Sequence, residues 1–382
     1  MQTRITRRAA LLAALVAAAV AALAGATVAT SASKKAVPPA PAALKKDIAA
    51  VKGLSVDARD AKLYALAQQE GGGLSFYTSL TSLSAPAVVK AFNAQYPNVK
   101  VNLFRGSSED VTAKVLAERN AHAQGGDVVE TNGTTMLVFQ HFKDVLVPYA
   151  GSPYRLKESK AYRFDTWSGD RLEKFVLAWN TNLVKPEDLP KTWADLADSK
   201  WKGKIALEPT DDDWFASLYT WMGKHGGPGG KPLTPKKLDA IWRGIGANAQ
   251  LINGHTTMSQ LLAAGQFAIA VNGHAQSLEQ LQAKKAPVAF NPFMTPVIDR
   301  PQGVGIPYSV AHPAAALLFY DFLLSPAGQK ALVDNGVAPA WAYTDNAFAS
   351  NPTTVHMDLR PIVSHLVAWS KKYDSFTRLG KG

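Results

Sequence analysis

Residues 74–108 read LSFYTSLTSLSAPAVVKAFNAQYPNVKVNLFRGSS, and their pattern decides the fold class. A short apolar stretch leads into a polar turn, and a helical repeat of apolar residues follows and ends at Pro97. Alternating Val99, Val101 and Leu103 then predict a second strand before another polar turn. A strand, a loop and a helix in this order predict parallel strands joined by helical crossovers.

The same pattern recurs along the rest of the chain. Asp127–Glu130 reads as a third short strand, and a second set of units begins near residue 171 with strands at 175–179, 204–207 and 267–271. The 382 residues are too many for one compact core. We therefore expect an α/β fold of two lobes, each a mostly parallel sheet flanked by helices. The extended, proline-interrupted segment 295–310 suits a connection between the lobes.

The N-terminus has the parts of an export signal. Arg4, Arg7 and Arg8 precede an uncharged, alanine-rich stretch, and residues 6–12 resemble a twin-arginine signal. We expect an export signal at 1–33, a loose proline-containing linker at 34–53 and a periplasmic location. An uncleaved membrane anchor is the alternative. The chain has no cysteine, which excludes a lipid anchor on cysteine and a disulfide framework.

Charge and motifs argue against other functions. The net charge is +11, but the basic residues are scattered and do not interleave with aromatic residues as on a nucleic-acid surface. The sequence contains no zinc-protease HExxH motif, no GxSxG elbow and no Walker-type phosphate loop. We therefore expect no enzymatic activity, no cofactor and no nucleic-acid partner.

Polar turns follow the strands of the first lobe. Parallel strands end at one edge of a sheet, where ligands bind in such folds, and these turns offer hydroxyls and helix N-terminal N–H groups. That chemistry suits oxygen-bearing or anionic ligands, although Ser, Thr and Asn are also common helix caps. The candidate contacts of this lobe are Thr78, Ser79, Thr81, Ser107, Ser108, Asn132 and Gly133.

The second lobe carries its own polar strand ends. Three consecutive aspartates, Asp211–Asp213, follow a strand and open a helix. They recognise a cationic or amine-bearing ligand, bind a divalent cation, or cap that helix. Trp214 lines the site or packs in the core. His255 could join His274 and the aspartates in a metal site, but no paired-ligand spacing supports this, and no metal site is predicted. The candidate contacts are Asp211, Asp212, Trp214, Asn253, Thr256, Asn272 and His274.

Several segments resemble family 1 extracellular solute-binding proteins. Ala67–Gly71 with Leu74–Ser79 is similar to the mature start of that family, and Gly126–Val129 is similar to its "ADVV" strand. The most specific segment is His312–Gln329, which resembles the family's pair of helices joined at Ser-Pro. These segments occur in the family's order over most of residues 60–335.

The resemblance implies a type II periplasmic-binding-protein fold with two crossover strands as a hinge. It implies lobes at 54–168 with 300–345 and at 169–299 with 346–382. It also implies that a monomer closes on a small polar solute and delivers it to an ABC permease in the inner membrane. A secreted hydrolytic enzyme, or a ligand sensor for a signalling receptor, is the alternative on the same fold.

The resemblance also implies a test for ferric iron. The iron-binding branch uses a His after the first strand, a Glu in a later loop and a Tyr-Tyr pair in the second lobe. Here the corresponding positions hold Thr78–Thr81, Asn132 and Gly273–Ala275. Ferric iron prefers hard anionic oxygen ligands, so we do not expect direct binding of the bare ion. A chelate or an organic solute stays open.

Overall fold

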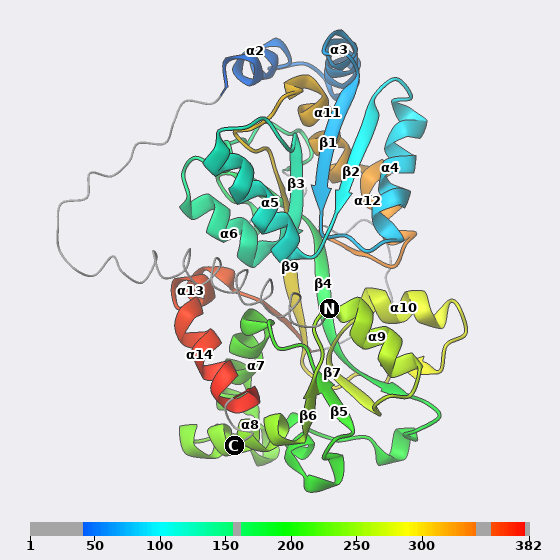
Figure 1. The fold of residues 1–382 in the computed structure, drawn as a ribbon, viewed down its shortest axis with the longest axis vertical. Helices are drawn as coiled ribbons and strands as arrows, with labels where there is room; N and C mark the ends of the chain where they lie inside the picture. The colour runs from blue at the N-terminus through cyan, green and yellow to red at the C-terminus, as the bar shows by residue number, and fades with distance from the viewer. Residues whose placement is uncertain (1–40, 156–161, 341–352, 379–382) are drawn as a thin grey trace, which may run out of the picture. The chain divides into compact units, whose positions relative to one another are not determined.

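The computed structural model describes residues 41–155, 162–340 and 353–378. The expected export signal at 1–33 lies outside these residues. The contacts divide the chain into two compact units (Figure 1). Unit 1 contains residues 1–172 and 301–345, and unit 2 contains residues 173–300 and 346–382.

The sheet of unit 1 is built from parallel strands, as the sequence predicts. β1 (Gly73–Thr78) lies between β2 (Lys100–Arg105) and β3 (Val128–Asn132) and runs parallel to both. β9 (Val297–Gly305) continues the sheet antiparallel to β3, and the short β10 (Ala338–Pro339) pairs with β4 (Trp167–Asn180). The polar turns after β1, β2 and β3 therefore share one edge.

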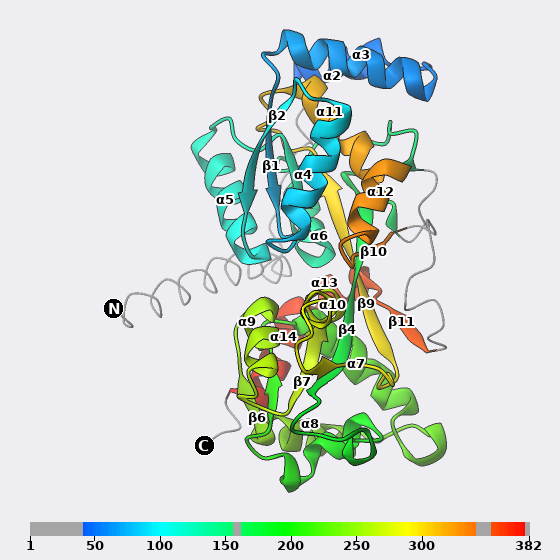
Figure 2. The ribbon, with the colours of Figure 1, turned by 90° about the vertical axis from the view of Figure 1, so that its right-hand side faces the viewer.

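Helices cover both faces of this sheet. Figure 2 shows α5 and α12 on opposite sides of β1 and β2. Every residue of α11 is buried, and its Phe319 ring lies 4.7 Å from Phe76 and 4.8 Å from Phe92. This aromatic contact fixes α11 against the sheet. The helices are α3 (Val56–Gln69), α4 (Ser84–Gln95), α5 (Ser108–Ala121), α6 (Gly133–His141), α11 (Pro313–Leu324) and α12 (Pro326–Val333).

The expected linker at 34–53 is wrong in its described part. Ala42–Ala50 forms the helix α2, which packs against α11. Leu44 in this helix and Val51 just after it are fully buried in the core of unit 1. Burial of these two side chains stabilises the helix although alanine and lysine dominate its composition.

Unit 2 repeats the arrangement with parallel strands of its own. β5 (Ile205–Leu207) lies between β6 (Ala249–Leu251) and β7 (Ile269–His274) and is parallel to both. The second half of β4 runs antiparallel to β7, and β8 (Val288–Ala289) pairs with the end of β4. β11 (Thr354–His356) runs parallel to β9. The chain thus passes between the units within β4 and within β9, as expected for the extended segment 295–310.

Helices and aromatic residues surround the sheet of unit 2. Figure 1 shows α9 and α10 on one side and α7, α8 and α14 on the other. Pro235 occupies the first turn of α8 behind the Thr234 cap, a preferred start for a helix. The helices are α7 (Asp212–His225), α8 (Pro235–Asn248), α9 (His255–Ala263), α10 (Ala275–Gln282), α13 (Leu359–Ser364) and α14 (Leu366–Thr377), with short 3₁₀ turns at Pro186–Asp188, Trp193–Ala197, Ser199–Trp201 and Pro228–Gly230.

A buried carboxyl group makes the stability of unit 1 depend on pH. Asp170 on β4 is fully buried, and burial, together with the nearby Glu130, raises the pKa of Asp170 well above its usual range. When folding raises the pKa of a carboxyl group, that group stabilises the folded protein at pH values below the pKa that it has in the unfolded chain. That contribution is lost as the pH rises toward the folded pKa.

We therefore predict that Asp170→Asn, which cannot ionise, gains stability relative to the wild type as the pH rises from 5 to 8. Melting temperatures of both proteins at the two pH values measure this. Asp334→Asn, a change of an exposed carboxylate that follows α12, is the control and should show no such trend. A melting-temperature difference between D170N and wild type that is the same at both pH values would contradict the assignment.

Candidate functional site

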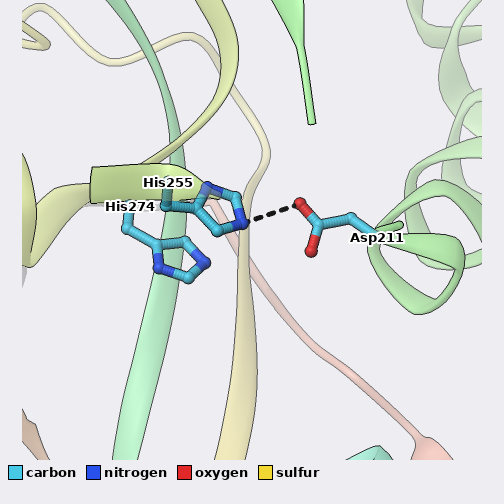
Figure 3. A group of neighbouring side chains, drawn as sticks. All are labelled: Asp211, His255 and His274. Carbon is cyan, nitrogen blue, oxygen red and sulfur yellow. Dashed lines mark ion pairs between the residues drawn. The ribbon is translucent and has the colours of Figure 1, made fainter. Parts of the chain in front are cut away.

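The candidate site lies at the carboxyl ends of the parallel strands in unit 2. The chain leaves β5 toward Asp211, leaves β6 toward His255 and ends β7 at His274. Because β5, β6 and β7 are parallel, their carboxyl ends meet at one edge, where α/β sheets bind ligands. Figure 3 shows the two imidazole rings beside the Asp211 carboxylate.

The buried amide of Asn272 holds this edge together. Its Oδ1 accepts a hydrogen bond from the backbone N–H of Glu208 at 2.9 Å. Its Nδ2 donates to the backbone oxygen of Glu208 at 3.2 Å and to Asp211 Oδ2 at 2.6 Å. One side chain on β7 therefore fixes both the segment after β5 and the carboxylate of Asp211.

Asp211 occupies the N-cap position of α7 but does not cap it with its side chain. Its carboxylate faces His255, with 3.1 Å between His255 Nε2 and Asp211 Oδ2, and Arg300 Nη1 lies 3.6 Å from Oδ1. The residue is 4% exposed. The sequence left open whether the aspartates act as helix caps, and Asp211 is instead directed at the other polar strand ends.

The two histidines form a stacked pair. Their ring centroids are 3.3 Å apart with an angle of 14° between the planes, and Phe175 packs edge-on against His274 at 5.0 Å. Nδ1 of His274 lies 3.5 Å from Glu173 Oε2. The side chains of His255 and His274 are only 14% and 15% exposed, and His255 Nδ1 and His274 Nε2 are buried.

Burial and mutual repulsion act on the carboxyl groups around this edge. Burial, and next the Asp211 carboxylate, raise the pKa of Glu208 to about 7. Burial and the Glu173 carboxylate raise the pKa of Glu279 to about 7. Both carboxyl groups therefore lie in weakly hydrated surroundings with another carboxylate nearby.

The structure brings together a set of three metal-ligand side chains that the sequence did not predict. Asp211, His255 and His274 each offer one ligand atom, and these atoms lie within 4.8 Å of one another. Imidazole and carboxylate are ligands of transition-metal ions. The three residues are far apart in the sequence, and only the strand order places them together.

The other residues that open α7, among them the predicted contacts Asp212 and Trp214, make different contacts from Asp211. Asp213 contacts Arg300 Nη1 at 3.1 Å and 3.2 Å, and Asp212 accepts a hydrogen bond from the Ser370 side chain. Burial raises the pKa of Asp212 to about 8. Trp214 is fully buried between aromatic rings that include Trp193 and Trp242, so its ring belongs to the core rather than to the exposed edge.

Asn253 and Thr256 are exposed on either side of the start of α9. They belong to the same connection between β6 and α9 that carries His255. Their side chains are thus accessible to a solute near this edge.

In unit 1, several of the predicted contacts serve the fold. Ser107 Oγ accepts from Asp110 N at 3.1 Å and caps α5, and Asn132 Oδ1 accepts from Thr135 N at 2.7 Å and caps α6. Thr78 is fully buried and donates to the Glu130 carboxylate. Ser79, Thr81 and Ser108 are partly exposed on the same edge, and Gly133 is buried as the first residue of α6.

A family model described as "Bacterial extracellular solute-binding protein" matches residues 87–356, which is most of the chain. The chain belongs to this family. The match includes the whole candidate site of unit 2. Among the described residues, no helix has the length and apolar character needed to cross a membrane.

This solute-binding protein is similar to the "Fe(3+)-binding periplasmic protein" of Serratia marcescens, with 23% identity over 198 residues. That match covers 48% of this chain and only 56% of the relative. Its fold is similar to iron-bound HitA from Pseudomonas aeruginosa (TM-score 0.65, 19% identity, 79% of this chain and 99% of that one). It is also similar to the periplasmic binding protein AfuA from Actinobacillus pleuropneumoniae with fructose-6-phosphate (TM-score 0.68, 20% identity, 80% and 99%). These similarities confirm the α/β periplasmic-binding-protein fold.

The sequence did not single out three charged residues at the site of this solute-binding protein. Glu173 on β4 contacts His274, Arg300 on β9 contacts Asp211 and Asp213, and Glu208 accepts from the backbone N–H of Gly254 at 3.3 Å. Two of them, Glu173 and Arg300, lie in strands that carry other charged residues as well, such as Asp170, Lys174 and Asp299. No pattern in the sequence therefore distinguishes the charged residues at this site from their neighbours.

We predict that Asn272→Ala lowers the free energy of unfolding by about 2 kcal/mol, because it leaves the buried N–H of Glu208 without its side-chain partner and removes a donor to Asp211. Urea unfolding followed by tryptophan fluorescence measures this. Asn253→Ala, a change of an exposed residue, is the control and should stay within about 0.5 kcal/mol of the wild type. Equal effects of the two changes would show that the Asn272 amide does not hold this edge.

Proposed function

We propose that the chain is the exported solute receptor of an ABC importer and that it binds a small polar solute at the strand ends of unit 2. The observation that carries this proposal is the group formed by the buried Asp211 and the partly exposed His255 and His274, with Asp211 held in place by Asn272. Membership in the solute-binding family supports it. Delivery to a permease follows from that family role and not from the geometry.

The chemistry of the edge favours a polar solute. Asp211 offers a carboxylate, the two histidines offer ring nitrogens, and Asn253 and Thr256 add an exposed amide and hydroxyl nearby. A small number of polar groups in fixed positions is typical of sites that select a ligand by orientation. In unit 1, Ser79, Thr81 and Ser108 are the exposed or half-exposed residues that remain candidates for further contacts.

Two relatives suggest solute classes to test first. One is named for Fe(3+), and one structure contains fructose-6-phosphate. The group in unit 2 has two imidazoles and one carboxylate, whereas bare ferric iron prefers anionic oxygen ligands. We therefore propose a metal chelate or an oxygen-rich organic solute rather than the bare ferric ion.

Export is part of the proposal. Arg7 and Arg8, followed by an alanine-rich stretch, favour the twin-arginine route. A reporter fused to residues 1–33 should reach the periplasm, and changing both arginines to lysine should abolish export. Unchanged export of the Lys-Lys form would contradict the twin-arginine route.

The binding test is a thermal-shift screen with phosphorylated sugars, carboxylates and metal chelates. A bound solute at about 100 times its Kd should raise the melting temperature of the wild type by roughly 5 °C. Asp211→Asn should remove most of this shift, because it replaces the central carboxylate. Asp188→Asn, an exposed carboxylate elsewhere in unit 2, is the matched control and should keep it.

Native mass spectrometry of protein purified without denaturants complements this screen, because the mass of a copurified solute identifies it. No copurified solute and no shift with any member of the library would contradict the proposal. An equal loss of the melting-temperature shift in D211N and D188N would show that the solute does not bind at Asp211.

A further inference from the structure

We infer that Asp211, His255 and His274 bind a divalent transition-metal ion of the zinc, nickel and cobalt class. Three protein ligands leave coordination positions for water or for oxygen atoms of a chelating solute. This inference rests on the proposed function and deepens it. It states that the solute bound at this edge is a metal complex.

The distances suit one ion. Zn–N and Zn–O bonds of about 2.0–2.2 Å place neighbouring ligands in a tetrahedron about 3.4 Å apart. His255 Nε2 and Asp211 Oδ2 are 3.1 Å apart, and the ligand atoms of all three side chains lie within 4.8 Å of one another. Because the two rings are stacked with 14° between their planes, one ring has to turn for both imidazole lone pairs to meet the same ion.

The orientation of the rings also suits a metal. Figure 3 shows a ring nitrogen of each histidine facing the Asp211 carboxylate. Nδ1 of His274 faces Glu173 at 3.5 Å, so the nitrogen directed at Asp211 is Nε2. A carboxylate at the far nitrogen is the usual device that orients a metal-binding imidazole and raises its basicity. Asn272 fixes Asp211 in the same way, by its 2.6 Å hydrogen bond.

The charges around the three ligands favour a cation. Asp211, Asp213, Glu173 and Glu208 supply carboxyl groups, and Arg300 is the one guanidinium that contacts the site among the described residues. Arg300 is closer to Asp213, at 3.1 Å, than to Asp211, at 3.6 Å. Arg300 is therefore shared between Asp213 and Asp211, and its single charge offsets only part of the negative charge around the three ligands.

Isothermal titration of EDTA-treated full-length protein with ZnCl₂ tests the inference. We expect one site, with affinity lowered at least 100-fold in His255→Gln and in His274→Gln. Glu173→Gln, a change at the positioning residue, should weaken binding about 10- to 100-fold. His225→Gln, an exposed histidine of the same unit, is the matched control and should bind as the wild type does.

Circular dichroism of each variant distinguishes loss of a ligand from loss of the fold. Zinc affinity that is equal in the wild type and in a folded variant lacking both His255 and His274 would overturn the inference. A solute that shifts the melting temperature of the EDTA-treated protein fully would also overturn it, while leaving the receptor function intact. Zinc binding without any solute shift would instead support the metal site and count against the receptor.

Discussion

The hydrogen bonds of the buried Asn272 amide are the interactions on which the site of unit 2 depends. Asn272 lies at the end of β7 and bonds both backbone groups of Glu208, which follows β5. The same amide bonds the Asp211 carboxylate. Because the amide is fully buried, these bonds are strongly preferred over any arrangement that leaves the partners unsatisfied. The position of Asp211 thus follows from the pairing of two strands.

The arrangement of charges follows from this fixed carboxylate. The Asp211 side chain does not cap α7 and instead meets His255. His274, which is stacked on His255, contacts Glu173 through its other ring nitrogen. Arg300 lies above the Phe175 ring at 4.8 Å and pairs with Asp213, which limits its neutralising effect on Asp211. Polar groups with so many partners are rigid, and rigid contacts lose little entropy when a solute binds.

Periodicity in the sequence was sufficient to predict the fold. The alternation at Val99–Leu103 predicts a strand, and the helical repeat before Pro97 predicts a helix, because each structure has its own period of buried residues. Strands and helices that follow one another in this way predict a parallel sheet. It also placed Asp211, Asn272 and His274 at one edge, since parallel strands end together. The helix α2 was missed because its composition is that of a linker, and only the burial of Leu44 reveals it.

The chemistry of individual residues was less predictable. Ser107 and Asn132 have the same residue types as ligand contacts, but their side chains cap helices, and no local pattern separates the two roles. The pairing of His255 with His274 depends on β6 and β7 both lying beside β5, which is a long-range property. Sequence spacing alone therefore gave no metal site.

Anomalous X-ray diffraction at the zinc edge, from crystals of the protein grown with zinc, tests the central claim most directly. The account predicts one strong peak about 2.0–2.2 Å from an Asp211 oxygen and from a ring nitrogen of both His255 and His274. It also predicts that Asn272 still bonds Asp211. A structure in which the Asp211 carboxylate turns away from both histidines, with no peak between them, would contradict it.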